Sequence, residues 1–196
     1  VDELIVLDID ASKKKSKINL DVLEILSRNT LMPFSYGGGI RTIDDIQKCL
    51  VFGCDKVVIN TECLQNIEFI NQAAKVFGSQ CIVVSVDYKI TNKNKCEVFS
   101  HSNFQTYKMD IKKYIKDLEN LGAGEIILTS VNHEGKLKGY DTDLFESISK
   151  EINIPILLNG GCGKPEHMID VFKNTEVNAA LAASIFHYET HSVNRV

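Results

Sequence analysis

The chain has 196 residues, 44% of them hydrophobic, and a formal net charge of −4 at pH 7. A chain of this length is typical of one domain with a sizeable core. Charges of both signs alternate without a basic stripe, so we expect no nucleic-acid partner. No apolar run reaches the ~18 residues of a membrane-spanning helix, so we expect no membrane association.

The first ten residues, VDELIVLDID, open directly into an apolar run and lack a starting methionine. They also lack the basic region and cleavage site of a signal peptide. We therefore expect an N-terminally truncated piece of a cytoplasmic protein. The cysteines agree with a reducing compartment, because no pair has CxxC spacing and several lie in apolar patterns. Buried free thiols are expected at Cys49, Cys54, Cys63, Cys81, Cys96 and Cys162.

Short apolar runs alternate along the chain with amphipathic stretches. The runs predict strands over 4–9, 33–36, 56–60, 81–88, 125–130, 155–159 and 179–184. The stretches between them predict helices over 18–28, 42–52, 62–77, 110–121, 142–151 and 165–174. Strands without strict alternation, each followed by a helix, are typical of an α/β fold with a parallel sheet. A further strand over 96–99 is expected to form a hairpin with the fourth strand, through a turn at 91–95.

The chain also repeats itself at a period of about 120 residues, far longer than a solenoid repeat. YGGGI at 36–40 returns as NGGCG at 159–163, each after a strand that begins with proline. Two similar halves predict a (β/α)8 TIM barrel, formed by 1–196 as a single domain. Only seven strands are present, so we expect the first βα unit to precede Val1 in a protein of roughly 250 residues. The last helix is expected to be incomplete, and a doubly wound open sheet is the alternative.

The glycine-rich segments lie where barrel strands end, which is where barrel enzymes carry their chemistry. Glycines at such ends expose backbone N–H groups and let a phosphate approach closely. Each segment has a neighbouring polar strand end, Asn60–Thr61 or Ala183–Ser184. Two such pairs predict two phosphate sites and a substrate with a phosphate at each end. For one loop alone, a tight turn with positive φ explains the glycines equally well.

Two aspartates end predicted strands, Asp8 after LIVL and Asp87 after VVSV. A carboxylate there can serve as a general acid or base, or it can cap the next helix or accept hydrogen bonds from loop amides. Glu134 and Gly135 are expected to line the same mouth, and His133 to be an exposed loop residue. Because no Cys, His or Asp cluster has metal-ligand spacing, we expect neither a metal nor a cofactor.

Eight segments carry a family resemblance, in order over nearly the whole chain: VDELIVLDIDAS, YGGGIRTIDD, GCDKVVIN, FGSQCIVVSVDYK, GAGEIILTS, KGYDTDL, GGCGKPEHM and AALAASIFH. Together they resemble the cyclase subunit of imidazole glycerol phosphate synthase, of histidine biosynthesis. The resemblance implies a ribulose-phosphate-binding (β/α)8 barrel and a lyase-type cyclisation. Ammonia from a glutaminase subunit in a heterodimer attacks the bis-phosphorylated intermediate PRFAR. The products are imidazole glycerol phosphate and AICAR.

The resemblance also implies roles for individual residues. Asp87 matches one catalytic aspartate, and the other would end the strand expected before Val1. One phosphate site matches Gly39, Asn60 and Thr61, and the other matches Gly135, Gly161, Ala183 and Ser184. An ammonia gate at the opposite end of the barrel matches Glu3, Lys56 and Glu125, and the glutaminase-docking face matches Asp55. Without the resemblance, these last four residues would form a surface ion-pair cluster, which stabilises a protein little.

Several residues depart from the family pattern. The segment 132–135 reads Asn-His-Glu-Gly where Asp-Arg-Asp-Gly is usual, and further departures are Asp10, Tyr36, Asn159 and Cys162. Those at Asp10 and Tyr36 are similar to a paralogous branch of surface-polysaccharide gene clusters, which supplies ammonia to a sugar-amidinating enzyme. The cyclase and an ammonia-channelling scaffold therefore both stay open, with a sugar-phosphate isomerase as a third alternative.

The missing strand also leads to an expectation about the chain by itself. A barrel that lacks one strand exposes two sheet edges, and exposed edges promote aggregation. We therefore expect these 196 residues alone to be inactive and poorly soluble.

Overall fold

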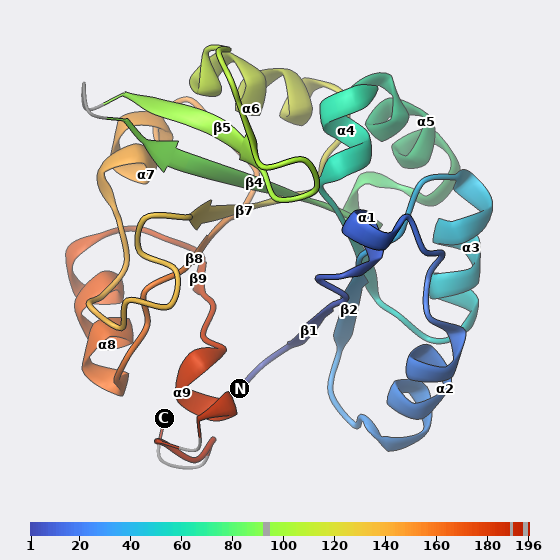
Figure 1. Cartoon of the computed structure of the whole chain (residues 1–196), viewed down its shortest axis with the longest axis horizontal. Helices are drawn as coiled ribbons and strands as arrows, with labels where there is room; N and C mark the ends of the chain where they lie inside the picture. The colour runs from blue at the N-terminus through green and yellow to red at the C-terminus, as the bar shows by residue number, and fades with distance from the viewer. Residues whose placement is uncertain (92–94, 189, 194–195) are drawn as a thin grey trace. The chain divides into compact units, whose positions relative to one another are not determined.

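The chain divides into two compact units in a computed structural model that describes residues 1–91, 95–188, 190–193 and 196. The first unit comprises residues 1–84, 101–103 and 120–124, and the second comprises 85–100, 104–119 and 125–196. Each has its own strands and helices (Figure 1). That 1–196 form a single barrel domain stays a prediction.

The first unit is built on parallel strands. They are β1 (Leu4–Leu7), β2 (Phe34–Gly37), β3 (Lys56–Ile59) and the beginning of β4 (Ile82–Ile90). Leu4 pairs with Phe34, Ser35 with Lys56, and Val57 with Ile82. All four residues of β2 are buried. Even the polar Ser35 is buried, as expected where a covered parallel sheet leaves no strand face in water.

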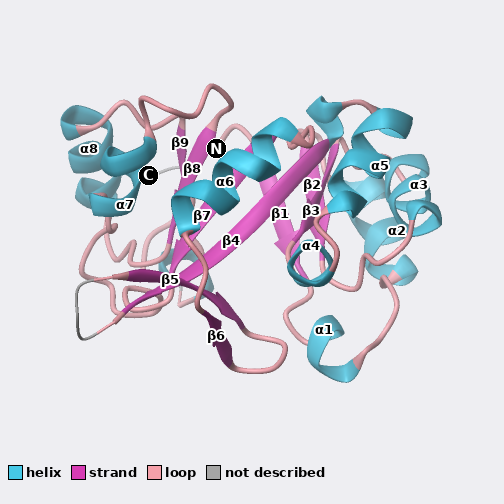
Figure 2. Ribbon diagram, turned by 90° about the horizontal axis from the view of Figure 1, so that it is seen from above, coloured by secondary structure: helices cyan, strands magenta, loops and turns pink. Residues whose placement is uncertain are grey.

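The first unit also contains the helices α1 (Ala11–Lys14), α2 (Leu20–Asn29), α3 (Ile43–Val51), α4 (Thr61–Gln65) and α5 (Glu68–Phe77), and a 3-10 turn, η1 (Ser79–Cys81). Helices α2, α3 and α5 lie together on one side of β1, β2 and β3 (Figures 1 and 2). Their apolar faces bury Leu23, Ile46 and Ile70 completely. The single helix predicted over 62–77 is wrong, because Asn66 is extended at φ −146° and separates α4 from α5. Asparagine is a weak helix former that favours helix ends.

The second unit continues the same pattern with β7 (Glu125–Ser130), β8 (Ile156–Asn159) and β9 (Ala179–Ala180), all parallel. Between and after them come α7 (Asp143–Ile148), α8 (Pro165–Asn174) and α9 (Ser184–His187), and α6 (Ile111–Asn120) precedes β7. Helices α7 and α8 lie on the same side of β8 and β9 (Figures 1 and 2).

An antiparallel extension of β4 lies in the second unit. The predicted extra strand is confirmed as β5 (Cys96–Ser100), in which Val98 pairs with Tyr88 of β4. A third strand, β6 (Gln105–Tyr107), was not predicted and pairs with β5 (Figure 2). The turn predicted over 91–95 falls on residues 92–94, outside the described residues.

Strand order decides between the two predicted fold classes. The hydrogen-bonded order is β1-β2-β3-β4-β7-β8-β9, which follows the chain without reversal. A doubly wound sheet reverses its order at a switch point, whereas a (β/α)8 fold does not. The (β/α)8 fold class is therefore confirmed. Within the described ranges, no helix combines the length and apolar content that crossing a membrane requires.

All six cysteines are free thiols, and four of them are buried: Cys49, Cys54, Cys63 and Cys162. A hydrogen bond with Cys54, together with burial, raises the pKa of the Cys49 thiol. A buried free cysteine behaves as a small apolar residue, so these four cysteines act as packing residues.

A capping box fixes the start of α3, directly after the first glycine-rich segment. Thr42 Oγ1 accepts a hydrogen bond from Asp45 N at 3.1 Å, and Asp45 Oδ2 accepts one from Thr42 N at 3.0 Å. We predict that Thr42→Ala lowers the free energy of unfolding by about 1 kcal/mol, measured by urea denaturation. Thr142→Ala is the matched control, because Thr142 precedes α7 without any side-chain cap bond. Equal losses in the two variants would contradict the prediction.

Candidate active site

The first glycine-rich loop joins β2 to α3. Gly38 and Gly39 have φ values of 103° and 76°, which residues with a side chain rarely adopt. A side-chain carbon at Gly38 would collide with the backbone oxygen of Asp8, and one at Gly39 would lie 3.0 Å from the carbonyl carbon of Lys17. Both the backbone conformation and close neighbours therefore require glycine here.

Strand register brings the predicted partners of this loop to the same edge. Gly37 pairs with Val58 across β2 and β3, so Gly39 and Asn60 lie equally far beyond that pair. Asn60 precedes α4, and Thr61 is its first residue. The three residues predicted for the first phosphate site thus come from adjacent strand ends of one unit.

The second glycine-rich loop follows β8 and has the same arrangement. Gly160 and Gly161 have φ values of 94° and 103°. Leu158 pairs with Ala180 across β8 and β9, so Gly161 and Ala183 lie equally far beyond that pair. Ser184 begins α9. In each half of the chain, the glycine loop therefore lies beside the end of the next strand, as the sequence repeat predicts.

A turn after β7 packs against this second loop. Glu134 N donates to Ser130 O at 2.9 Å, and Gly135 adopts φ 69°. A side-chain carbon at Gly160 would lie 3.5 Å from Glu134 N, and one at Gly161 would lie 3.2 Å from His133 Cβ. The turn thus places the backbone of His133 and Glu134 against the second glycine loop, and Gly135 follows them in the chain.

The two aspartates singled out from the sequence have different surroundings. Asp87 is 8% exposed and accepts a hydrogen bond from Ser85 Oγ at 3.2 Å. It lies inside β4, which is longer than predicted because Tyr88–Ile90 pair with β5, so Asp87 caps no helix. Asp8 Oδ1 accepts from Asp10 N at 3.1 Å and from Ala11 N at 3.0 Å. Asp8 therefore makes the loop-amide bonds that the alternative interpretation describes.

A buried network that sequence reasoning missed lies beside the second loop. Asp141 is 8% exposed, and its Oδ2 accepts from Tyr88 Oη at 2.9 Å and from Ser130 Oγ at 3.1 Å. His133 also contacts this network, because its Nδ1 lies 3.0 Å from Ser130 Oγ. The His133 side chain is 34% exposed. Burial and the Asp141 carboxylate raise the pKa of Tyr88 above its ordinary value. No local pattern signals this network, since its members come from three separate segments.

Most residues that depart from the family pattern make side-chain hydrogen bonds or ion pairs. Asn132 Oδ1 accepts from Ile90 N at 2.8 Å, and Asn159 Nδ2 donates to Thr129 Oγ1 at 3.2 Å. Tyr36 Oη accepts from Asn19 N at 3.0 Å, and Asp10 pairs with Lys14 at 2.6 Å. These contacts account for the departures as fixing points between neighbouring segments.

At the N-terminal ends of the strands lie the charged residues that the resemblance indicates. In the first unit, Lys56 Nζ lies 2.8 Å from Glu3 Oε2, and Ser35 Oγ bonds to Glu3 Oε1. Glu125 is the first residue of β7 in the second unit. Asp55 is exposed, and its Oδ2 accepts from Phe34 N at 3.0 Å.

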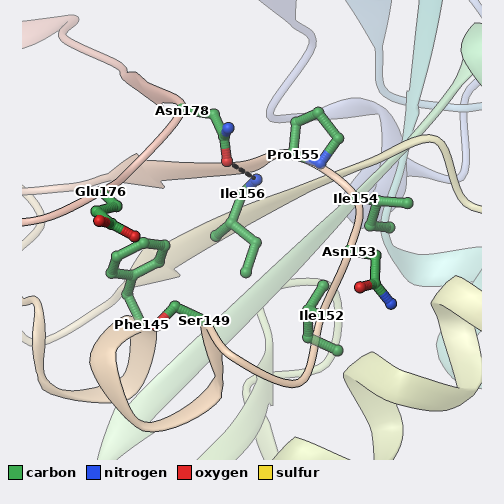
Figure 3. Close-up of a pocket in the computed structure, with 9 residues that line it drawn as sticks. All are labelled: Phe145, Ser149, Ile152, Asn153, Ile154, Pro155, Ile156, Glu176 and Asn178. Atoms are coloured by element: carbon green, nitrogen blue, oxygen red, sulfur yellow. Dashed lines mark hydrogen bonds between the residues drawn. The ribbon is translucent and has the colours of Figure 1, made fainter.

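A pocket at the N-terminal end of β8 is separate from the glycine loops. It is lined by Phe145, Ser149, Ile152, Asn153, Ile154, Pro155, Ile156, Glu176 and Asn178 (Figure 3). Ile156 N donates to Asn178 Oδ1 at 3.0 Å across it (Figure 3). Since the second glycine loop follows the opposite end of β8, this pocket is not part of the candidate site. In the part of the chain that the structure describes, no His, Cys, Asp and Glu side chains gather as a metal site.

Comparisons with known proteins agree with this geometry. Residues 1–192 match the family described as "Histidine biosynthesis protein". The chain is 44% identical over 192 residues to imidazole glycerol phosphate synthase subunit HisF of Hydrogenobaculum sp., covering 98% of the chain and 76% of that protein. It is 41% identical over 213 residues to HisF of Methanococcus maripaludis (98% and 78%), and 42% over 195 residues to HisF of Bacillus cereus (100% and 77%). These names support the cyclase interpretation and give no support to the ammonia-channelling scaffold.

The raised pKa of Tyr88 leads to a prediction at alkaline pH. The unfolded chain ionises its tyrosines near pH ~10, whereas folded Tyr88 keeps its proton to higher pH. Its contribution to stability is therefore present below about pH 10 and is lost as the pH rises toward the folded pKa. We expect the free energy of unfolding to fall less between about pH 9 and pH 11 in Tyr88→Phe than in the wild type. Tyr188→Phe, at a residue 72% exposed, is the control, and identical slopes in both variants would contradict the assignment.

Proposed function

The chain belongs to the histidine biosynthesis family of imidazole glycerol phosphate synthase cyclase subunits, and we propose that it converts PRFAR and ammonia into imidazole glycerol phosphate and AICAR. The observation that carries the proposal is the repeated pairing of a glycine loop with the end of the next strand. Such a repeat suits a substrate with two phosphates, which PRFAR is. The identity to curated cyclase subunits covers the segments that form both pairs.

We propose that each phosphate is held mainly by the main chain. Gly39, Asn60 and Thr61 bind one phosphate, and Gly135, Gly161, Ala183 and Ser184 bind the other. Support comes from the positive φ values of the glycines, a backbone conformation from which anion-binding loops are built. The hydroxyl groups of Thr61 and Ser184 add one donor each.

Asp87 is the acid–base group of the proposal. Ring closure requires a proton to leave the attacking nitrogen and another to reach a departing group, and a positioned carboxylate can carry both in turn. The support is its burial and the hydrogen bond from Ser85, which restricts its rotation. Asp8 positions the loop after β1 through its two amide bonds, and Glu134 lines the mouth beside the second phosphate.

The N-terminal strand ends are proposed to receive ammonia from a glutaminase subunit in the cytoplasm. Glu3, Lys56 and Glu125 form the gate, and the 2.8 Å contact between Glu3 and Lys56 supports a closed ion pair. Asp55 contributes to the docking face. Apolar residues of the first unit that stand exposed near this end support docking: Leu31 at 103%, Met32 at 40% and Val51 at 78%. Exposed apolar side chains beside charged ones are typical of protein interfaces.

The cyclase proposal is tested with the full-length gene product, PRFAR and ammonium salt, without glutaminase. Loss of substrate absorbance measures turnover. We predict that Asp87→Asn lowers kcat by about a hundredfold or more, because the amide cannot accept a proton. Asp170→Asn, an exposed change on α8, is expected to leave turnover unaltered. A folded wild-type protein without turnover would contradict the proposal and favour the ammonia-channelling scaffold.

The gate is tested by comparing two nitrogen sources. In Lys56→Met the ion pair with Glu3 is lost, so the route from the glutaminase is no longer controlled. We predict that glutamine-dependent turnover falls about tenfold, whereas turnover with ammonium salt changes by less than about twofold, because free ammonia can enter from the mouth. Lys75→Met on α5 is the control. Equal losses with both nitrogen sources would indicate a structural role for Lys56 instead.

A further inference from the structure

A lysine-rich segment lies between β1 and α2, next to the first glycine loop. Residues 13–17 contain Lys13, Lys14, Lys15 and Lys17, all exposed. Residues 8–19 carry four lysines and two aspartates, so their net charge is +2 in a chain of net charge −4. The segment is therefore positively charged, whereas the chain as a whole is negatively charged.

The segment does not continue as a helix. Lys15 has φ 51°, in the left-handed region, and ends α1 after one turn. A residue with a side chain adopts this conformation only where its surroundings hold it there. Figure 2 shows α1 at the same end of the first-unit strands as α4, which is the end that carries Asn60 and Thr61.

The first glycine loop and its flanking residues hold the segment in place. The Arg41 guanidinium donates to Lys15 O at 3.2 Å and to Ala11 O at 3.4 Å. The backbone of Lys17 lies against Gly39, where even one added carbon would be 3.0 Å away. At the end of the segment, Asn19 N donates to Tyr36 Oη. The backbone that carries the lysines is therefore fixed to the loop that the proposed function assigns to one phosphate.

The lysines of the segment differ in whether a carboxylate neutralises them. Lys14 pairs with Asp10 at 2.6 Å, and the Asp8 carboxylate bonds to backbone amides. Among the described residues, no carboxylate forms an ion pair with Lys15 or Lys17. The proposed phosphate-binding residues Gly39, Asn60 and Thr61 bring no cationic side chain of their own. The Arg41 guanidinium donates to two backbone carbonyls of the segment. The positive charges that flank this loop are therefore those of Arg41 and of the lysines on the segment that Arg41 holds.

We propose that Lys15 and Lys17, held by Arg41, form a cationic rim that draws the phosphate of the substrate to the first glycine loop. This inference rests on the proposed function and adds substrate-binding residues to it. Main-chain amides orient a bound phosphate but carry no net charge. A lysine ammonium group adds a positive charge on a flexible side chain beside the glycine loop, and this charge attracts the phosphate. The rim therefore acts on substrate capture rather than on the chemical step.

The test compares two double variants of the full-length protein that remove the same net charge. Lys15/Lys17→Gln removes the rim, and Lys75/Lys150→Gln removes two exposed lysines elsewhere. With PRFAR and ammonium salt, we expect the rim variant to raise KM about tenfold at low ionic strength, with kcat within about twofold. The difference is expected to shrink as salt is added, because exposed charges are screened. A rim variant whose KM and salt dependence equal those of the control would overturn the proposal.

A binding measurement separates the rim from the cyclase reaction. Inorganic phosphate is titrated into each protein by calorimetry, and the rim variant is expected to bind it several-fold more weakly than the control. If the rim variant binds phosphate more weakly than the control while the wild type shows no turnover of PRFAR, the proposed function fails and the rim stands. Lys17→Glu, which keeps the backbone against Gly39, should weaken phosphate binding further. Equal phosphate affinity in all these proteins would refute the rim even if turnover is present.

Discussion

Parallel register between neighbouring strands is the constraint on which the candidate site depends. Gly37 opposite Val58 and Leu158 opposite Ala180 decide which residues meet where the strands end. A slip of one residue would turn every side chain of a strand to the other face and would move each glycine loop away from its polar neighbour. The buried strand residues that fix the register therefore also fix the site, although they do not line it.

Close backbone approach is the second condition, and it explains the positions of the glycines. Asp8 lies against Gly38, Lys17 against Gly39, and Gly139 N donates to Gly161 O at 2.8 Å. In each case a loop from the preceding βα unit rests directly on the glycine loop of the next. A side chain at these positions would separate the two loops as well as strain the backbone. Each half of the site is thus formed by loops of consecutive βα units that contact one another.

The sequence predicted the strands and most helices, because apolar runs and amphipathic periodicity report burial directly. The prediction was wrong where a single residue, Asn66, interrupts the helical pattern between α4 and α5. It also missed β6, which is short and polar. For Asp8 it left both a chemical role and an amide-bonding role open, and only the geometry shows the two amide bonds. The contacts among Tyr88, Ser130 and Asp141 were invisible, since spacing along the chain carries no information about side chains from distant strands meeting. The roles of the phosphate-binding, catalytic and gate residues remain predictions.

The glycine loops have a consequence for how such a protein evolves. A loop that offers main-chain N–H groups is inherited as a backbone conformation and not as a set of side chains. Substitutions around it, such as Asn132, Asn159 and Tyr36, can then be absorbed by bonds to their immediate neighbours. Recognition of an anion and the reaction that follows it can therefore diverge independently. A lineage can retain what it binds while it exchanges the chemistry performed on the bound molecule.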